Sequence, residues 1–289
     1  MLAAAILFST GGAVIKATSL TGWQVASLRC GIAALAVLIL IPASRRGWNY
    51  RTWVVGGSYA GAVIAYALAN KLTTAASTIF LCSTSPLYVL ILGPLLLRER
   101  ARKRDLLFVL AFAIGLSLVF LDAESASVTS PEPLKGNVLA ALSGFFFAML
   151  VMGFRWLNKT SPPGQSSSVS AVAVGNLIGA AVCLPPALPL ASVEALDWAL
   201  LSYLGVFQIA LAYLLLTSAL RRLAALEASL LILVEPVLNP IWTWLWHGER
   251  PGPLTLAGGV LIVAVTAGMT LLSAWQAGPR RQDDSSLGQ

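Results

Sequence analysis

Apolar residues run along this chain in stretches of about 20, and short polar segments separate the stretches. A helix of about 20 apolar residues is long enough to cross a hydrocarbon core of about 30 Å. The pattern therefore predicts an all-α polytopic membrane protein. We expect ten transmembrane helices, over residues 2–19, 23–42, 52–70, 74–97, 105–121, 136–156, 169–188, 198–219, 224–246 and 253–275.

The composition supports a lipid environment. Hydrophobic residues make up 57% of the 289 residues and charged residues only 11%, whereas soluble domains carry about a quarter charged residues. One soluble domain of this length could not bury so much apolar surface. The first span follows Met1 without the preceding Lys or Arg of a signal peptide, so we expect it to be retained.

The basic residues are distributed unevenly among the loops. If the N-terminus is cytoplasmic, fourteen Lys and Arg lie on the cytoplasmic side and four on the opposite side. This is the positive-inside pattern, and it predicts a multi-pass protein with both termini in the cytoplasm. The short loops suit a bacterial inner membrane, which is the expected location. The net charge of +7 then reflects topology, and no nucleic-acid partner is expected.

The chain also divides into two similar halves. The acidic segment "DAESASVTSPEP", residues 122–133, leaves five spans on either side, and an odd number of spans per half makes any repeat inverted. "SPLYVLILGPLLLRER" (85–100) aligns with "EPVLNPIWTWLWHGER" (235–250) at an offset of 150. We therefore expect a first five-helix repeat at 1–121, an external linker at 122–135, a second, inverted repeat at 136–276 and a disordered cytoplasmic tail at 277–289.

Each half has a tyrosine before a short turn ("YALANKL", "YLLLTSAL"), then a proline within a span and Glu-Arg at the end of that span. This order resembles the EamA-type repeat of the drug/metabolite transporter superfamily, and the resemblance covers nearly the whole chain. The lengths and the aromatic content are most similar to the YddG-type aromatic amino-acid exporters. The resemblance implies a ten-helix basket with a central cavity between the halves and transport by alternating access.

The most unusual polar residue is Glu235, in the middle of an apolar run. A carboxylate at membrane depth is costly unless it finds a partner or water. Pro236 and Pro240 free backbone groups that are tolerated where they line a cavity, and Asn239 shares the helix face of Glu235. The pattern favours a cavity wall that binds a substrate ammonium group. The alternative is a structural carboxylate that bonds to a neighbouring helix.

Other candidate binding residues are hydroxyl-bearing or aromatic. Ser83 and Thr84 precede Pro86 and could face a substrate carboxylate, or they could bond back to their own helix. Tyr59 and Tyr66 lie seven residues apart and share a helix face. We expect Tyr66 and Trp242 to bracket the substrate side chain, with Tyr213 as a further aromatic candidate, and Pro86, Pro236 and Pro240 to act as helix breaks or hinges.

Arg29 is the only basic residue well inside a span. We expect its long side chain to snorkel to the outer interface; the alternative is a role in binding the substrate. Phosphorylated solutes, which would need several cations at membrane depth, are therefore disfavoured as substrates.

Motifs for chemistry are missing from the sequence. It has one histidine, no zinc-protease, serine-hydrolase or Walker motif, and three cysteines in three different spans. We therefore expect neither an enzyme nor an ATP-driven pump, no metal and no cofactor. The prediction is a secondary transporter that exports aromatic or other neutral amino acids as a facilitator. The alternative is proton-coupled efflux of lipophilic cationic drugs or metabolites. The expected partners are a small-molecule substrate and the lipid bilayer; the oligomeric state stays open, with a monomer among the options.

Overall fold

The computed structural model describes residues 2–96, 103–122, 127–160, 167–190, 193–220, 231 and 233–277. Within these ranges every regular element is helical. In chain order they are α1 (Leu2–Ser9), α2 (Gly11–Ala17), α3 (Gly22–Leu40), the 3-10 turn η1 (Pro42–Arg45), α4 (Tyr50–Leu72), α5 (Ala75–Cys82), α6 (Ser85–Leu96), α7 (Lys103–Leu121), α8 (Pro133–Thr160), α9 (Ser167–Ala187), α10 (Ala195–Ser202), the π-helical stretch η2 (Tyr203–Leu211), α11 (Ala212–Leu220), α13 (Val234–His247) and α14 (Pro253–Ala277).

The helices confirm the predicted all-α class. Among the described residues, seven helical segments are long and apolar enough to cross a bilayer, and 2–17 and 106–121 form shorter apolar helices. The predicted span 224–246 and the predicted tail lie partly outside the described residues, so the number ten remains a prediction. The seven segments are Gly22–Leu40, Tyr50–Leu72, Ala75–Gly93, Pro133–Thr160, Ser167–Ala187, Ala195–Leu216 and Pro253–Leu272.

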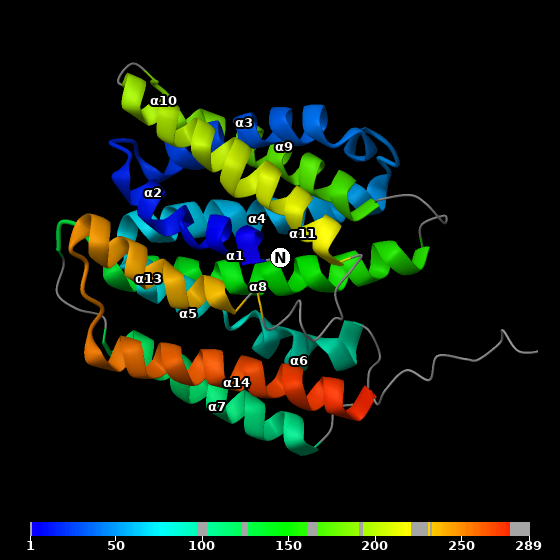
Figure 1. Ribbon diagram of the computed structural model, residues 1–289, viewed down its shortest axis with the longest axis vertical. Helices are drawn as coiled ribbons and strands as arrows, with labels where there is room; N and C mark the ends of the chain where they lie inside the picture. Colours follow the sequence, from blue (N-terminus) through cyan, green and yellow to red (C-terminus); the bar gives the residue numbers. More distant parts are fainter. Residues whose placement is uncertain are drawn as a thin grey trace, which may run out of the picture.

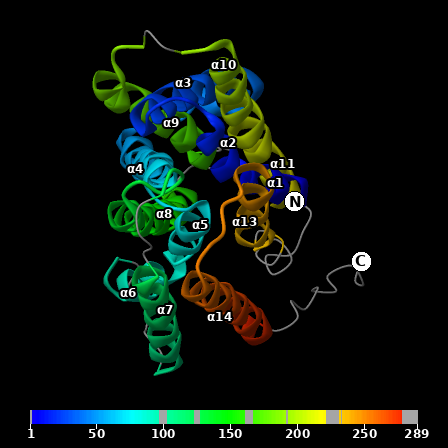
Figure 2. The ribbon, with the colours of Figure 1, turned by 90° about the vertical axis from the view of Figure 1, so that its left-hand side faces the viewer.

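The helices run side by side across the molecule (Figure 1). One edge is formed by α3, α9 and α10 and the opposite edge by α7 and α14. Between the edges, α4 packs against α8 and α9, and α1 packs against α13 and α11. The view from the side separates α13, α1 and α11 from α4 and α8 (Figure 2). The middle of the bundle therefore lies where these two groups of helices face each other.

Several apolar segments are interrupted near their middle. The first divides at Thr10 into α1 and α2, directly before Gly11 and Gly12, and glycine is a poor helix former. Another divides at Ser83 and Thr84 into α5 and α6. Pro86 is the second residue of α6, in the first turn, where the N–H that proline lacks would have had no partner within the helix.

Loops that are distant in sequence meet at one end of the bundle, at the left of Figure 1, which we call the Lys16 end. Lys16 forms an ion pair with Glu249, and Lys71 Nζ donates to the Thr18 carbonyl at 2.7 Å. Asp197 accepts bonds from the backbone N–H and the hydroxyl of Ser19 at 2.9 and 2.6 Å. These loops are the ones that the charge pattern assigns to a common side of the membrane.

Candidate substrate site

Helix α13 carries three of the predicted site residues toward the middle of the bundle. Asn239 is fully buried, while Glu235 and Trp242 are half-buried. The Trp242 indole Nε1 donates to Ser9 Oγ at 2.9 Å and so links α13 to α1. Pro236 lies in the first turn of α13 and Pro240 in its interior. Because Pro240 has no N–H, the carbonyl one turn earlier loses its helical partner.

Asn239 and Tyr66 meet across the bundle. Asn239 Nδ2 donates to the Tyr66 hydroxyl at 3.2 Å, and Asn70 Nδ2 donates to the Tyr66 carbonyl at 2.9 Å. Gly12 makes room for both amides: a Cβ there would lie 2.8 Å from Asn239 Oδ1 and 3.0 Å from Asn70 Oδ1. The two amide oxygens are buried and have no hydrogen-bond donor in the described part of the chain. The junction of α1 and α2 is therefore lined by unsatisfied acceptors.

A second aromatic group lies on the α3 and α9 side of the bundle. The rings of Tyr59 and Tyr213 lie 6.1 Å apart edge to face, and Phe8 lies 5.4 Å from Tyr213. Asn176 Nδ2 donates to the Tyr59 hydroxyl at 3.2 Å. Gly175 leaves the space that the Tyr59 ring fills, since a Cβ there would lie 2.6 Å from Tyr59 Cδ1. Tyr59 is buried as a result, whereas Tyr213 stays half-exposed.

The hydroxyls of span 4 are engaged locally. Ser83 Oγ donates to the Ile79 carbonyl at 2.8 Å, and Thr84 Oγ1 donates to the Leu81 carbonyl at 2.6 Å. The structure thus shows the back-bonded alternative for both residues. Their hydroxyl hydrogens are used within the helix, and only lone pairs remain for another group.

The structure contradicts the prediction that Arg29 snorkels to the outer interface. Its side chain does not snorkel: the residue is only 2% exposed. Val25, Ala26 and Ala33, which share its face of α3, are fully buried, so this face points into the bundle. Arg29 Nε and Nη1 are buried without a hydrogen-bond partner among the described residues.

Sequence reasoning also missed Phe8, Ser9, Asn70 and Asn176. The Gly11–Gly12 pair within an apolar span was a usable signal for close packing at this point, because glycines admit close neighbours, although it does not predict the helix break itself. In the described ranges no three His, Cys, Asp or Glu residues come together as metal ligands would.

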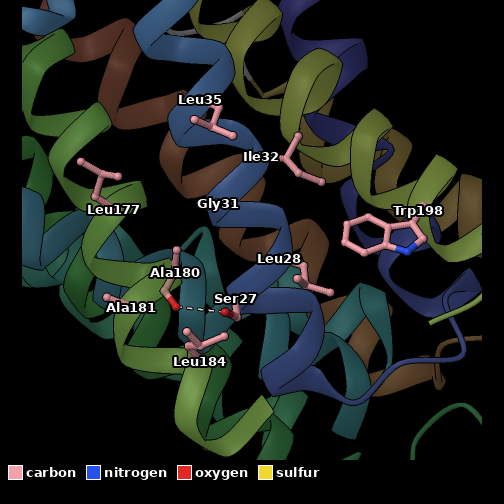
Figure 3. A pocket seen from close by; sticks show the side chains of 10 residues that line it. All are labelled: Ser27, Leu28, Gly31, Ile32, Leu35, Leu177, Ala180, Ala181, Leu184 and Trp198. Atoms are coloured by element: carbon pink, nitrogen blue, oxygen red, sulfur yellow. Dashed lines mark hydrogen bonds between the residues drawn. The ribbon is translucent and has the colours of Figure 1, made fainter. Parts of the chain in front are cut away.

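An apolar groove of about 420 Å³ lies away from these residues, between α3, α9 and α10 (Figure 3). Its wall is formed largely by aliphatic side chains and Trp198, and Leu35 and Trp198 are 62% and 46% exposed on the outer surface. The Ser27 hydroxyl donates to the Ala180 carbonyl at 2.9 Å. The groove suits lipid chains and offers little to a polar solute.

The sequence profile of the EamA-like transporter family matches residues 1–121 and 134–271, which is most of the chain. The chain belongs to the EamA-like transporter family. It is therefore a multi-pass membrane protein of a transporter family. The two matched segments leave residues 122–133 between them.

Two curated relatives of this EamA-like protein are named pseudopaline exporter CntI. They come from Pseudomonas aeruginosa strains UCBPP-PA14 and ATCC 15692 (PAO1). Each is 25% identical over 269 residues, which is 90% of either chain. A crystal structure of another protein shares the fold with a TM-score of 0.60 and 20% identity, over 95% of this chain and 96% of that one.

Proposed function

We propose that this EamA-like protein is a secondary transporter that exports amino acids, aromatic or other neutral ones, by alternating access and as a facilitator. The observation that carries the proposal is the state of Glu235. Its carboxylate lies on the same helix face as Asn239 and forms no hydrogen bond or ion pair within the described residues. A free carboxylate at membrane depth suits the ammonium group of a solute.

The aromatic residues supply the rest of the site. Tyr66 is bonded to Asn239, and the half-buried Trp242 lies seven residues after Glu235 on α13. Tyr213 and Tyr59 add a further aromatic contact. This lining fits an apolar side chain, as in the YddG-type exporters that the sequence resembles. Ser83 and Thr84 keep hydroxyl lone pairs at the α5–α6 junction and would contribute acceptors only.

The packing supports two inverted repeats. If each predicted span is replaced by its counterpart five spans away in the other half, the α4–α8 pair becomes α11–α1. The α5–α8 pair becomes α13–α1 in the same way. All four pairs are in contact. The α3–η2 pair likewise becomes α9–α4, also in contact, and the α3–α9, α7–α14 and α5–α13 pairs map onto themselves. Such pseudo-symmetry is typical of carriers that rock one half against the other around a central site.

The Lys16 end would then be one of the two gates. The Lys16–Glu249 ion pair joins the first half of the chain to the second and is almost inaccessible to solvent. With the predicted topology this end faces outward, and the structure corresponds to a state closed to the outside. Alternating access would require the pair to separate when the transporter opens outward.

The direction of transport is taken from relatives. The two similar Pseudomonas proteins are named as exporters, and the predicted location is a bacterial inner membrane with both termini in the cytoplasm. Their named substrate is not assumed for this protein. The residues around Glu235 favour a smaller class, amino acids and closely related metabolites.

The proposal is tested with purified protein in liposomes. Uptake of labelled Phe, Trp, Thr and Met is compared with uptake of ethidium, with and without an imposed pH gradient. We expect amino-acid flux that follows the amino-acid gradient and is indifferent to the pH gradient. Flux of ethidium alone, driven by the pH gradient, would refute the proposal and support proton-coupled efflux of lipophilic cations.

A further inference from the structure

Arg29 is a buried cation that forms no ion pair with any described residue. It lies on the bundle-facing side of α3, is 2% exposed, and leaves Nε and Nη1 without a hydrogen-bond partner in the described part of the chain. An isolated buried charge is among the costliest groups that a protein can contain. A buried charge that finds no partner among the described residues suits the binding of an anionic group of the substrate.

Four described carboxylates near the loops are engaged elsewhere and so are not that partner. Glu249 pairs with Lys16, and Glu132 pairs with Lys135. Asp197 is bonded to Ser19, and Asp122 accepts from the backbone N–H of Thr255. Glu235 is the remaining described carboxylate in the interior of the bundle, and it forms no ion pair with Arg29 or with any other described cation.

Two tyrosines lie near both Glu235 and Arg29. The hydroxyl groups of Tyr66 and Tyr213 both lie within electrostatic range of Glu235 and of Arg29. Tyr59 and Cys30 are within range of Arg29, and Cys82 is within range of Glu235. The same two tyrosine hydroxyls therefore lie near both Glu235 and Arg29. Within the described residues, an anion and a cation that form no ion pair thus lie near one aromatic pair.

We propose that Arg29 is a substrate-binding residue that takes the carboxylate of the solute while Glu235 takes its ammonium group. This assignment rests on the proposed amino-acid transport and sharpens it. The substrate class becomes zwitterions with an apolar or aromatic body, which lies against Tyr66 and Tyr213. Arg29 replaces Ser83 and Thr84 as the main carboxylate partner.

The chemistry of arginine suits this role. Its planar guanidinium presents several N–H donors in a fork that matches a carboxylate, and such charge-assisted bonds are stronger than neutral ones. A zwitterion would neutralise both buried charges at once. A simple amine would leave Arg29 unpaired, and a simple acid would leave Glu235 unpaired, so each should be transported poorly.

The test compares phenylalanine with phenethylamine, which has the same body and ammonium group without the carboxylate. Transport of both is measured in liposomes that contain wild type, Arg29→Gln, Arg29→Lys or the surface control Arg51→Gln. Arg51 lies over the rings of Tyr50 and Trp156, far from these contacts in the fold. The melting temperature of each empty protein is recorded in detergent.

We expect wild type and Arg51→Gln to prefer phenylalanine. Arg29→Gln should lower phenylalanine transport by roughly 10- to 100-fold, keep phenethylamine transport, and bring their ratio near one. Arg29→Lys should fall between them. Because Nε and Nη1 have no partner in the described protein, the empty Arg29→Gln variant should melt at the wild-type temperature or above it.

An unchanged ratio in a folded Arg29→Gln variant would overturn the assignment of Arg29 and leave the proposed function standing. Loss of folding in both Arg29 variants would also overturn it, since Arg29 would then be needed for the fold. A wild-type protein that moves no amino acid would instead refute the proposed function, and the assignment of Arg29 with it.

Discussion

Lys16 Nζ lies 3.2 Å from Glu249 Oε1, and both side chains are almost completely buried. Lys16 also donates to the carbonyls of Thr73 and Thr129, and Glu249 Oε2 accepts from the backbone N–H of Ala75 at 3.0 Å. Segments from both matched halves of the chain and from the residues between them thus converge on one ion pair. We interpret this ion pair as the contact that holds the Lys16 end closed.

The ion pair predicts strong non-additivity. Lys16→Met or Glu249→Gln alone should each lower the free energy of unfolding by about 3–5 kcal/mol, because each leaves a buried charge uncompensated. The double variant should recover most of the loss. Unfolding in mixed micelles with increasing dodecyl sulfate measures all four proteins. Additive losses in the double variant would mean that the two charges do not stabilise each other.

Gly12 predicts a steric effect with a matched control. Gly12→Ala should abolish most transport, since the new Cβ would lie 2.8 Å from Asn239 Oδ1 and would displace the amide that bonds to Tyr66. Gly57→Ala, on α4, meets no atom within 4 Å and should transport normally. Its stability should rise by up to about 1 kcal/mol from helix propensity. Equal transport by both variants would contradict the proposed role of the α1–α2 junction.

Much of the fold could be predicted from sequence patterns because the thickness of the bilayer sets the length of a transmembrane helix. Runs of about 20 apolar residues marked the helices, and the all-α class is confirmed. The break before Pro86 follows from backbone chemistry that is local in sequence. The division of the first span at Thr10 was not predicted, since Gly11 and Gly12 alone do not say whether a helix continues across them.

The contacts between side chains on different helices of the site could not be predicted from the sequence. That Glu235 and Asn239 share a face follows from helical spacing, but the Asn239–Tyr66 bond joins residues 173 positions apart and depends on how α4 and α13 pack. Arg29 was mispredicted for the same reason. Its depth in the span is compatible with snorkelling, and only the packing of α3 shows that its face points inward.

The bond between Trp242 and Ser9 predicts a measurable coupling. Trp242→Phe and Ser9→Ala should each destabilise the protein, and a double-mutant cycle should give a coupling of about 1 kcal/mol for the lost bond. Trp244→Phe, on the same helix but 52% exposed, should show no coupling to Ser9→Ala. A coupling near zero for Trp242 would exclude a contribution of this bond to stability.

The predicted topology can be tested by labelling. In a cysteine-free background, Val128→Cys should react with a membrane-impermeant maleimide in intact cells, because Val128 is fully exposed in the segment predicted to be external. Tyr50→Cys, 67% exposed at the other end of the bundle, should react only after permeabilisation. The reverse result would invert the topology and would assign the Lys16 end to the cytoplasm.

The most direct test of the central claim is phenylalanine flux through Glu235→Gln in liposomes, beside wild type and Glu132→Gln. Glu132 is a surface carboxylate whose side chain is 46% exposed, so it controls for the loss of a charge. We expect Glu132→Gln to match wild type and Glu235→Gln to lose roughly 10- to 100-fold in flux at low substrate concentration, as a lost charge-assisted bond implies. Wild-type flux through a folded Glu235→Gln protein would contradict a direct role of this carboxylate in substrate binding.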